Sequence, residues 1–286
     1  MNLAPAPRLI VNADDLGMSA GINRAIFEGH DHGIVTSTSL MAVGSELEGA
    51  LAGLAARPRL GCGLHLVLSE ERPVLPPSAI PGLVDADGRF PPLQSVLRRL
   101  VAGALPRAEV EAELGAQIER PLAAGVPLTH LDSHCHLHAF PSLGPLVHAL
   151  GRRFGVPCAR KAEAQWLAEL WVAPLGRVPL ALVISACHRF TLLRVARPLR
   201  TPDRMLGLLR SGAIEAGWLA GAIAALPAGT VTELMVHPGD GSDGPAGADH
   251  GALARRAELD ALLSPAVADA VRRAGVELVS YRHLAA

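Results

Sequence analysis

Short apolar runs alternate along the chain with stretches in which apolar residues recur at helical spacing. A short apolar run between turn-forming residues is typical of a buried strand, whereas apolar residues every three or four positions are typical of a helix. Strands are therefore expected at 9–12, 35–43, 61–68, 128–132, 232–236 and 277–280. Helices are expected at 21–33, 45–56, 93–104, 107–125, 143–154, 202–211 and 213–226, and at 253–274 with a break at Pro265.

The order of these elements predicts an α/β fold. Strands that alternate with helices form a parallel sheet with the helices outside it. No repeat or low-complexity linker divides the chain, so residues 1–286 are expected to form a single domain. Residues 72–92 are rich in proline and glycine and predict a loop. A covering insertion with helical pieces is expected at about 160–226.

The composition favours a soluble protein that does not bind nucleic acid. The chain has 286 residues, of which 50% are hydrophobic, and a formal net charge of -1, so no global field attracts a polyanion. Its four cysteines form no CxxC pair, which favours reduced thiols in the cytoplasm. The apolar run at 9–11 is too short for a signal peptide. The most apolar later stretch, 178–187, is shorter than the roughly 20 residues that cross a bilayer.

Two adjacent carboxylates, Asp14 and Asp15, follow the first predicted strand. Such neighbours repel each other unless a positive group lies beside them, and a bound cation is one solution. A helix N-cap is the other interpretation, because an aspartate before a helix accepts hydrogen bonds from backbone N–H groups. A cap explains one of the two aspartates but not both.

His65 lies in the otherwise apolar strand predicted at 61–68. A buried imidazole needs a polar partner, which can be a backbone carbonyl or a metal ion. A lone histidine in such a strand is more often an ordinary core residue. Gly63, two positions earlier, leaves room for the close approach of a ligand or of another backbone.

A third group of polar residues falls at every second position from the predicted strand at 128–132 onwards: His130, Asp132, His134, His136 and His138. In an extended chain, alternate residues share one face, so these side chains are expected to point the same way. The pattern indicates a metal or proton-transfer site rather than a solvated loop. Asp132 is suited to orient a ligating imidazole through its second ring nitrogen. Cys135 is expected on the opposite face and is not counted as a ligand.

His237 closes the strand predicted at 232–236 and is followed by Pro238. An imidazole that titrates near neutral pH suits a general acid. An ordinary turn residue before proline is the alternative interpretation.

Together these segments resemble the YdjC-like carbohydrate deacetylases. The resemblance rests on residues 12–17 (NADDLG), 33–38 (GIVTST), 63–65 (GLH), 129–138 (THLDSHCHLH) and 236–239 (VHPG), and it runs from about residue 9 to about residue 282. It implies an irregular (β/α) barrel of the polysaccharide-deacetylase-like type. Cys135 stands where relatives often carry histidine or glutamine.

The resemblance also implies roles for individual residues. Asp15, His65 and His134 would hold one divalent metal ion, Asp14 would be the general base, and His237 would be the general acid. Asp132, His136, His138 and Arg160 are expected to lie around the ion, where they support its ligands or contact the substrate. Zinc is the favoured ion for such nitrogen and oxygen ligands, while magnesium, iron, cobalt, nickel and manganese remain open.

A finer resemblance is to the hopanoid-associated branch of that family, HpnK. It rests on the apolar stretch 166–200, on residues 201–208 (TPDRMLGL) and on Ser211 with Gly212. It implies removal of the acetyl group from an N-acetylglucosaminyl hopanoid glycolipid. Residues 166–200 would then receive a lipid tail or touch the inner face of a membrane, or else form a lid on the barrel.

Other functions stay open beside this one. A soluble chitooligosaccharide or N-acetylglucosamine deacetylase keeps the same chemistry with another substrate. A metal-dependent phosphoesterase would need more carboxylates than the chain obviously supplies. A non-catalytic sugar- or lipid-binding barrel would not need Asp14 beside a metal ligand. A homodimer is compatible with the sequence and is not predicted by it.

Overall fold

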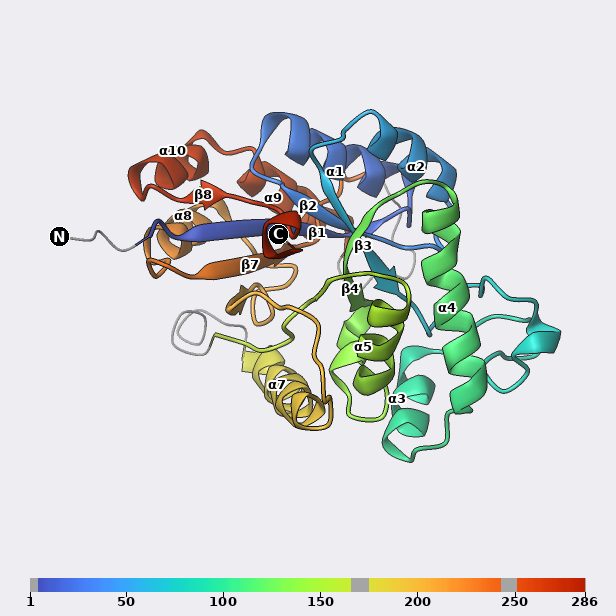
Figure 1. The fold of residues 1–286 in the computed structure, drawn as a ribbon. Coiled ribbons are helices and arrows are strands. Elements are labelled where there is room, and N and C mark those ends of the chain that lie inside the picture. The colour runs from blue at the N-terminus through green and yellow to red at the C-terminus, as the bar shows by residue number, and fades with distance from the viewer. Residues whose placement is uncertain (1–4, 166–174, 243–250, 286) are drawn as a thin grey trace.

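The computed structural model describes residues 5–165, 175–242 and 251–285, and within these ranges eight strands form one parallel sheet surrounded by helices (Figure 1). The strands are β1 (Arg8–Leu16), β2 (Ser37–Leu40), β3 (Gly61–Leu66), β4 (Leu128–Ser133), β5 (Cys158–Ala159), β6 (Arg204–Leu206), β7 (Val231–Val236) and β8 (Glu277–Leu278). The α-helices are α1 (Ala20–His32), α2 (Leu47–Ala55), α3 (Leu93–Val101), α4 (Arg107–Ala123), α5 (Gly144–Arg153), α7 (Val178–Leu193), α8 (Ala216–Ala224), α9 (Ala252–Leu262), α10 (Pro265–Arg273) and α11 (Arg282–Ala285). Three short 3-10 helices are η1 (Pro77–Ala79), η2 (His134–Ala139) and η4 (Leu175–Arg177).

The sheet curls into an irregular barrel. Its strand order is β5-β4-β3-β2-β1-β7-β6, and β8 pairs with the start of β1. Isolated bridges from Cys158 to Arg200 and from Ala164 to Met205 link the β5 edge to the β6 edge. The predicted α/β fold of the irregular (β/α) barrel type is confirmed. Because all these strands are parallel, their carboxyl ends meet on one side of the barrel, where a site can form.

Local sequence explains why the first unit folds as it does. Leu9, Ile10 and Val11 are buried in β1, as expected for a strand covered on both faces. The Ser19 side chain then caps α1 by accepting a hydrogen bond from the Ile22 backbone N–H at 3.1 Å. The apolar stripe of α1, which includes Ile22 and Ile26, packs into the main core. This compact unit fixes the position of the β1 carboxyl end.

The region from 160 to 226 differs in part from the prediction. A helix was expected at 202–211, but β6 occupies Arg204–Leu206 and pairs with β7. A strand of three residues is too short to show a period-two pattern. The helical spacing of apolar residues in the same segment therefore led to the wrong prediction of a helix. Residues 166–174, with Trp166 and Trp171, lie outside the described part of the chain. The covering insertion stays a prediction.

Helix α7 is unusually apolar on its outer surface. Leu180, Val183, Phe190 and Leu193 are all exposed there. Among the described residues, no helix is both long and apolar enough to cross a membrane. Of these four residues, Leu180 and Val183 line the pocket described below, whereas Phe190 and Leu193 do not.

Candidate metal centre and active site

A distortion at the end of β1 turns two neighbouring carboxylates toward one cavity. The pairing of β1 with β2 shifts register between Ala13 and Leu16. Within this irregular stretch Asp15 adopts φ 71°, a left-handed conformation that is uncommon outside glycine. Adjacent residues of a regular strand point to opposite faces, but a bulge re-aims one of them. Asp14 and Asp15 consequently both line the same pocket.

Asp15, His65 and His134 present one ligand atom each to a common point. Asp15 Oδ1 lies 3.4 Å from His65 Nε2 and 3.4 Å from His134 Nδ1, and all three atoms are within 4.8 Å of one another. Donors about 2.1 Å from a tetrahedral ion are roughly 3.4 Å apart, so the spacing fits zinc. Asp15 Oδ1 is also buried without a hydrogen-bond partner among the described residues. These residues therefore fit a divalent cation, and their role as ligands stays a prediction.

Asp132 orients the His65 ring. The two residues are register partners on β3 and β4, and Asp132 Oδ1 lies 2.8 Å from His65 Nδ1. This contact leaves Nε2 facing Asp15, which is the usual way in which a carboxylate fixes a metal-binding imidazole. Burial lowers the pKa of His65, but Asp132, with Asp14 and Asp15, outweighs that effect and the net pKa is raised. In the protein alone, a proton thus competes with a cation for this ring.

A fully buried arginine holds the neighbouring aspartate, Asp14. Arg160 Nη1 donates to Asp14 Oδ2 and Nη2 donates to Asp14 Oδ1, both at 2.6 Å. The same guanidinium lies 2.9 Å from Asp132 Oδ2 and donates to Glu233 Oε1 at 2.9 Å. Burial raises the pKa of Asp14, and Arg160 opposes that rise only in part. Burial also raises the pKa of Glu233 to about 7. Arg160 was expected near the ion, and it lies behind Asp14 and Asp132.

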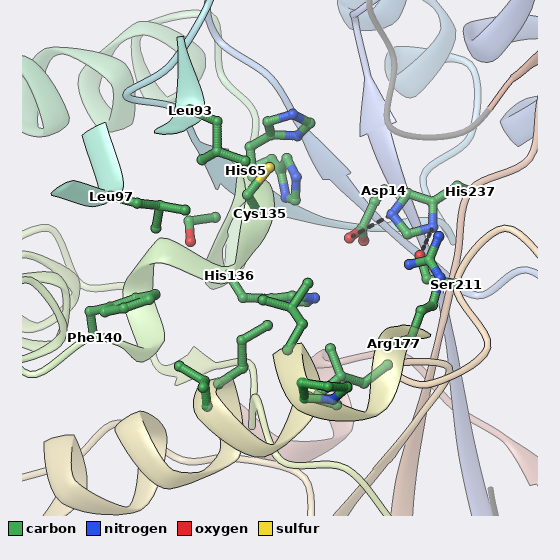
Figure 2. Close-up of a pocket in the computed structure, with 18 of the residues that line it drawn as sticks. Asp14, His65, Leu93, Leu97, Cys135, His136, Phe140, Arg177, Ser211 and His237 are labelled. Atoms are coloured by element: carbon green, nitrogen blue, oxygen red, sulfur yellow. Dashed lines mark hydrogen bonds and ion pairs between the residues drawn. The ribbon is translucent and has the colours of Figure 1, made fainter. Parts of the chain in front are cut away.

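His237 lies beside Asp14 in the lining of the cavity. Its Nε2 is 3.8 Å from Asp14 Oδ2, and its Nδ1 is 3.3 Å from Ser211 Oγ (Figure 2). The backbone N–H of His237 donates to Glu258 Oε2 at 2.6 Å. The predicted base and the predicted acid are therefore neighbours at the same side of the pocket.

The predicted row of imidazoles after β4 is wrong beyond Ser133. Residues 134–139 form a 3-10 helix, and Cys135 and His136 adopt positive φ values of 54° and 55°. His134 and His136 line the pocket, but so does Cys135, which was expected on the opposite face. The alternation of faces ends where the extended backbone ends.

Two histidines of that row, His130 and His138, are buried and make contacts away from the pocket. The His130 ring stacks on Tyr281 with centroids 3.7 Å apart, and burial lowers the pKa of His130 to about 3. A side chain at Gly63 would collide with the His130 ring, so the space expected for a ligand holds this imidazole. His138 Nδ1 lies 2.7 Å from Ser133 Oγ, and His138 is not among the residues that line the pocket.

The pocket has a volume of about 750 Å³ and a polar end opposite apolar walls. Figure 2 shows Asp14, His237 and Ser211 at one end, with Leu97 and Phe140 on the far side. The polar end holds Asp14, Asp15, His65, His134, Ser211 and His237, whereas the apolar walls include Leu93, Leu97, Val101, Phe140, Pro179, Leu180, Ala181, Val183, Ile184 and Leu208. Such a cavity fits a polar reacting group with an apolar substituent.

Sequence reasoning missed three buried charged residues around this pocket: Glu233, Arg255 and Glu258. Glu233 on β7 was detectable, because a charge in a buried strand needs a partner just as His65 does. Arg255 and Glu258 lie on α9, and charged residues on an amphipathic helix are usually solvated. Arg255 Nη2 donates to Asp15 Oδ2 at 2.6 Å. Burial would raise the pKa of Asp15, but Arg255 and the two neighbouring histidines hold it well below its ordinary value.

Comparison with known proteins places these features in context. The model of a family described as YdjC-like protein matches residues 8–273. A carbohydrate deacetylase of Brevibacillus brevis is 45% identical over 150 residues, which are 52% of this chain and 58% of that protein. A chitooligosaccharide deacetylase of Serratia marcescens is 39% identical over 163 residues, which are 57% and 62% of the two chains. The matches thus span little more than half the length of these relatives.

A solved structure extends the comparison to almost the whole chain. A protein of Enterococcus faecalis V583, named for cellobiose-phosphate cleavage, is similar with a TM-score of 0.77 and 25% sequence identity. The match covers 98% of this chain and 99% of that one. The overall fold therefore recurs in a second protein over almost its whole length.

Proposed function

Because this chain belongs to the YdjC-like protein family, we propose that it is a hydrolase that removes the acetyl group from an N-acetylated amino sugar with the help of one divalent cation. The observation that carries this proposal is the convergence of Asp15, His65 and His134 on one point, with Asp14 beside it. A binding site for sugar would not need this second carboxylate. The names of the two curated relatives favour the same chemistry.

Asp14 is proposed as the general base. A cation bound at Asp15, His65 and His134 would polarise the acetyl carbonyl and make water more acidic. Asp14 then accepts a proton from the attacking water. The raised pKa of Asp14 brings it closer to the working pH, which makes the carboxylate a better general base. Arg160 fixes both oxygens of Asp14, so the carboxylate keeps a single orientation.

His237 is proposed as the general acid. The tetrahedral intermediate collapses only when the leaving amine gains a proton. His237 Nε2 is 3.8 Å from Asp14 Oδ2 and both residues line the pocket, so both groups can reach the same amide. Ser211 contacts the other ring nitrogen and limits rotation of the imidazole.

Acetate release with and without a chelator tests this proposal. The protein is stripped of metal, and zinc, magnesium, iron, cobalt, nickel and manganese are restored one at a time. We expect no acetate from N-acetylglucosamine oligomers or glycolipid without metal, and we expect the best recovery with zinc. Full turnover by stripped protein contradicts the role of the ion. Sugar binding without acetate release from any substrate favours the non-catalytic barrel.

A lipid-linked sugar is the proposed substrate, of the N-acetylglucosaminyl hopanoid class. Most of the apolar wall residues belong to α3 and α7, and Phe140 is the one phenylalanine, tyrosine or tryptophan among the described lining residues. A long sugar chain usually stacks on several aromatic rings, whereas a lipid needs an apolar surface. A soluble chitooligosaccharide is the second candidate, since the Serratia marcescens relative is named for it.

A series of alkyl N-acetylglucosaminides of increasing chain length separates these substrates. Burial of one methylene contributes about 0.8 kcal/mol, so kcat/KM should rise up to about fourfold per methylene until the wall is covered. Leu180→Ser is expected to flatten this rise, because Leu180 lines the pocket. Leu253→Ser is the control, since Leu253 is exposed on α9 away from the pocket lining. No dependence on chain length, with faster turnover of chitooligosaccharides, contradicts the lipid proposal.

The exposed side of α7 is proposed to rest on a membrane surface. Phe190 and Leu193 are exposed on α7, and the Arg194 guanidinium lies over the Phe190 ring. An apolar face beside basic side chains suits an anionic bilayer. Sedimentation with anionic vesicles should fall in Phe190→Ser and should not change in Leu253→Ser. A homodimer that hides α7, detected by light scattering, would contradict the membrane role.

A further inference from the structure

Helix α9 carries two buried charges whose partners belong to the candidate site. Arg255 and Glu258 are three positions apart and therefore lie on the same face of the helix. Both are buried, whereas Arg256 and Asp260 on the same helix are exposed. Buried charges are retained when they are paired. The partners of these two residues lie on the β1 and β7 ends, so α9 connects to both halves of the site.

Arg255 occupies one oxygen of the proposed metal ligand. Its Nη2 donates to Asp15 Oδ2 at 2.6 Å, while Asp15 Oδ1 faces His65 and His134. The remaining guanidinium atoms, Nε and Nη1, are buried without a hydrogen-bond partner among the described residues. Most of the hydrogen-bonding capacity of Arg255 is thus unused, which is costly. Among the described residues, the one side-chain hydrogen bond that the Arg255 guanidinium makes therefore goes to Asp15.

The loop after His237 is built to let α9 come close. Gly239 N–H donates to the Arg255 carbonyl at 3.1 Å. A Cβ at Gly239 would lie 2.9 Å from Arg255 Cβ, so a side chain there would push the helix away. Glu258 then accepts from His237 N–H at 2.6 Å and from Gly212 N–H at 2.7 Å. The same helix therefore fixes the main chain beside both His237 and Ser211.

We propose that Arg255 is a positioning residue that restricts Asp15 to ligation through one oxygen. Glu258, on the same face of α9, fixes the backbone of His237 next to that ligand. The inference rests on the proposed ion at Asp15, His65 and His134. With Oδ2 held by Arg255, Asp15 offers Oδ1 alone and coordination positions stay open for water and substrate. Without Arg255, the carboxylate is free to rotate and to offer both oxygens.

The test compares Arg255→Met with Arg256→Met, a matched control on the exposed side of α9. Zinc affinity is measured by competition with a coloured chelator, and coordination is followed by the visible spectrum of the cobalt-loaded protein. Loss of a residue that orients a ligand typically costs 10- to 100-fold in metal affinity, so we expect a loss of that size in Arg255→Met. We also expect an altered cobalt spectrum, since a two-oxygen carboxylate raises the coordination number. Arg256→Met should match wild type in both measurements.

Glu258→Gln separates the two arms of the proposal. A glutamine has one acceptor oxygen in place of two, so one of the N–H contacts to His237 or Gly212 is lost. We expect a lower kcat with unchanged zinc affinity, because these contacts lie on the His237 side. An equal loss of zinc affinity in Glu258→Gln and Arg255→Met would indicate a general effect of helix packing and would overturn the proposal.

The remaining outcomes also decide the matter. A folded Arg255→Met protein with zinc affinity within about threefold of wild type, or with an unaltered cobalt spectrum, overturns the positioning role. If Arg255→Met does not fold, Arg255→Lys gives the decision by the same two measurements, because lysine keeps the charge but not the guanidinium geometry. Wild-type protein that binds neither zinc nor cobalt refutes the proposed function itself, which is a separate result.

Discussion

Replacement of Arg160 by methionine should destabilise the protein and change the pH dependence of its activity. The guanidinium is fully buried, contacts both oxygens of Asp14 at 2.6 Å, and lies 2.9 Å from both Asp132 and Glu233. Methionine has a similar length but no charge. The substitution therefore leaves three buried carboxylates without their shared cation.

The expected loss is a large part of the total stability. Removing one partner of a buried ion pair typically costs about 3–5 kcal/mol, against about 5–15 kcal/mol for the whole domain. The carboxylates respond with pKa values raised above those of the unfolded chain. A raised pKa in the folded state contributes stability below the unfolded pKa and loses it as the pH rises through the folded pKa. The deficit of Arg160→Met should therefore be smallest near pH 5 and largest near pH 8.

Urea unfolding at several pH values measures this deficit, and the pH profile of kcat reports on Asp14. The acidic limb of the profile should move to higher pH, because Asp14 must be ionised to act as the base. Arg256→Met is the control for loss of a surface arginine. A folded Arg160→Met protein that stays within about 1 kcal/mol of wild type at pH 8, with an unshifted kcat profile, would refute the reasoning.

Three further substitutions give sharp expectations. Asp14→Asn should keep its metal content but lose about 10²–10⁴-fold in kcat, and acetate assays with metal analysis would expose full activity if Asp14 is not the base. Zinc at about 100 times its dissociation constant should raise the free energy of unfolding of wild type by about 2.7 kcal/mol, as measured by thermal unfolding. His134→Ala should lose this stabilisation, and an equal stabilisation of both proteins would remove His134 from the ligand set. Gly63→Ala places a Cβ within 2.5 Å of the His130 ring and should cost about 1–3 kcal/mol in urea unfolding, whereas Gly221→Ala, with nothing within 4 Å, should be neutral or stabilising; equal effects would contradict the close packing at Gly63.

The fold class was predictable because the spacing of apolar residues differs clearly between the strands and the helices. Buried parallel strands read as apolar runs, and the helices between them have apolar stripes, so the α/β class followed directly. The two-residue strand β5 and the three-residue strand β6 were not predicted, because so few residues cannot show a periodic pattern. They form through pairing with strands already in place, which is a tertiary effect.

The site was predictable only as far as the backbone stays regular. His65 and Asp132 meet because their strands are extended and adjacent. Beyond Ser133 the chain turns at Cys135 and His136, which both adopt left-handed backbone conformations, and no local sequence pattern predicts that turn. The inward direction of Asp15 likewise depends on the irregularity in β1, where Asp15 itself adopts φ 71°. Such irregularities are common beside functional sites, and they defeat any rule based on alternation.

Two adjacent aspartates with the same side chain have their pKa values shifted in opposite directions. Asp14 has both oxygens held by Arg160, and burial leaves its pKa raised. Asp15 has one oxygen held by Arg255, and its pKa is held well below its ordinary value. A base must be able to take a proton near neutral pH, whereas a metal ligand must stay ionised. When two neighbouring carboxylates have their pKa values driven apart, the direction of each shift indicates its role. The assignment of Asp14 as base and Asp15 as ligand therefore has a physical ground that is independent of the resemblance in sequence.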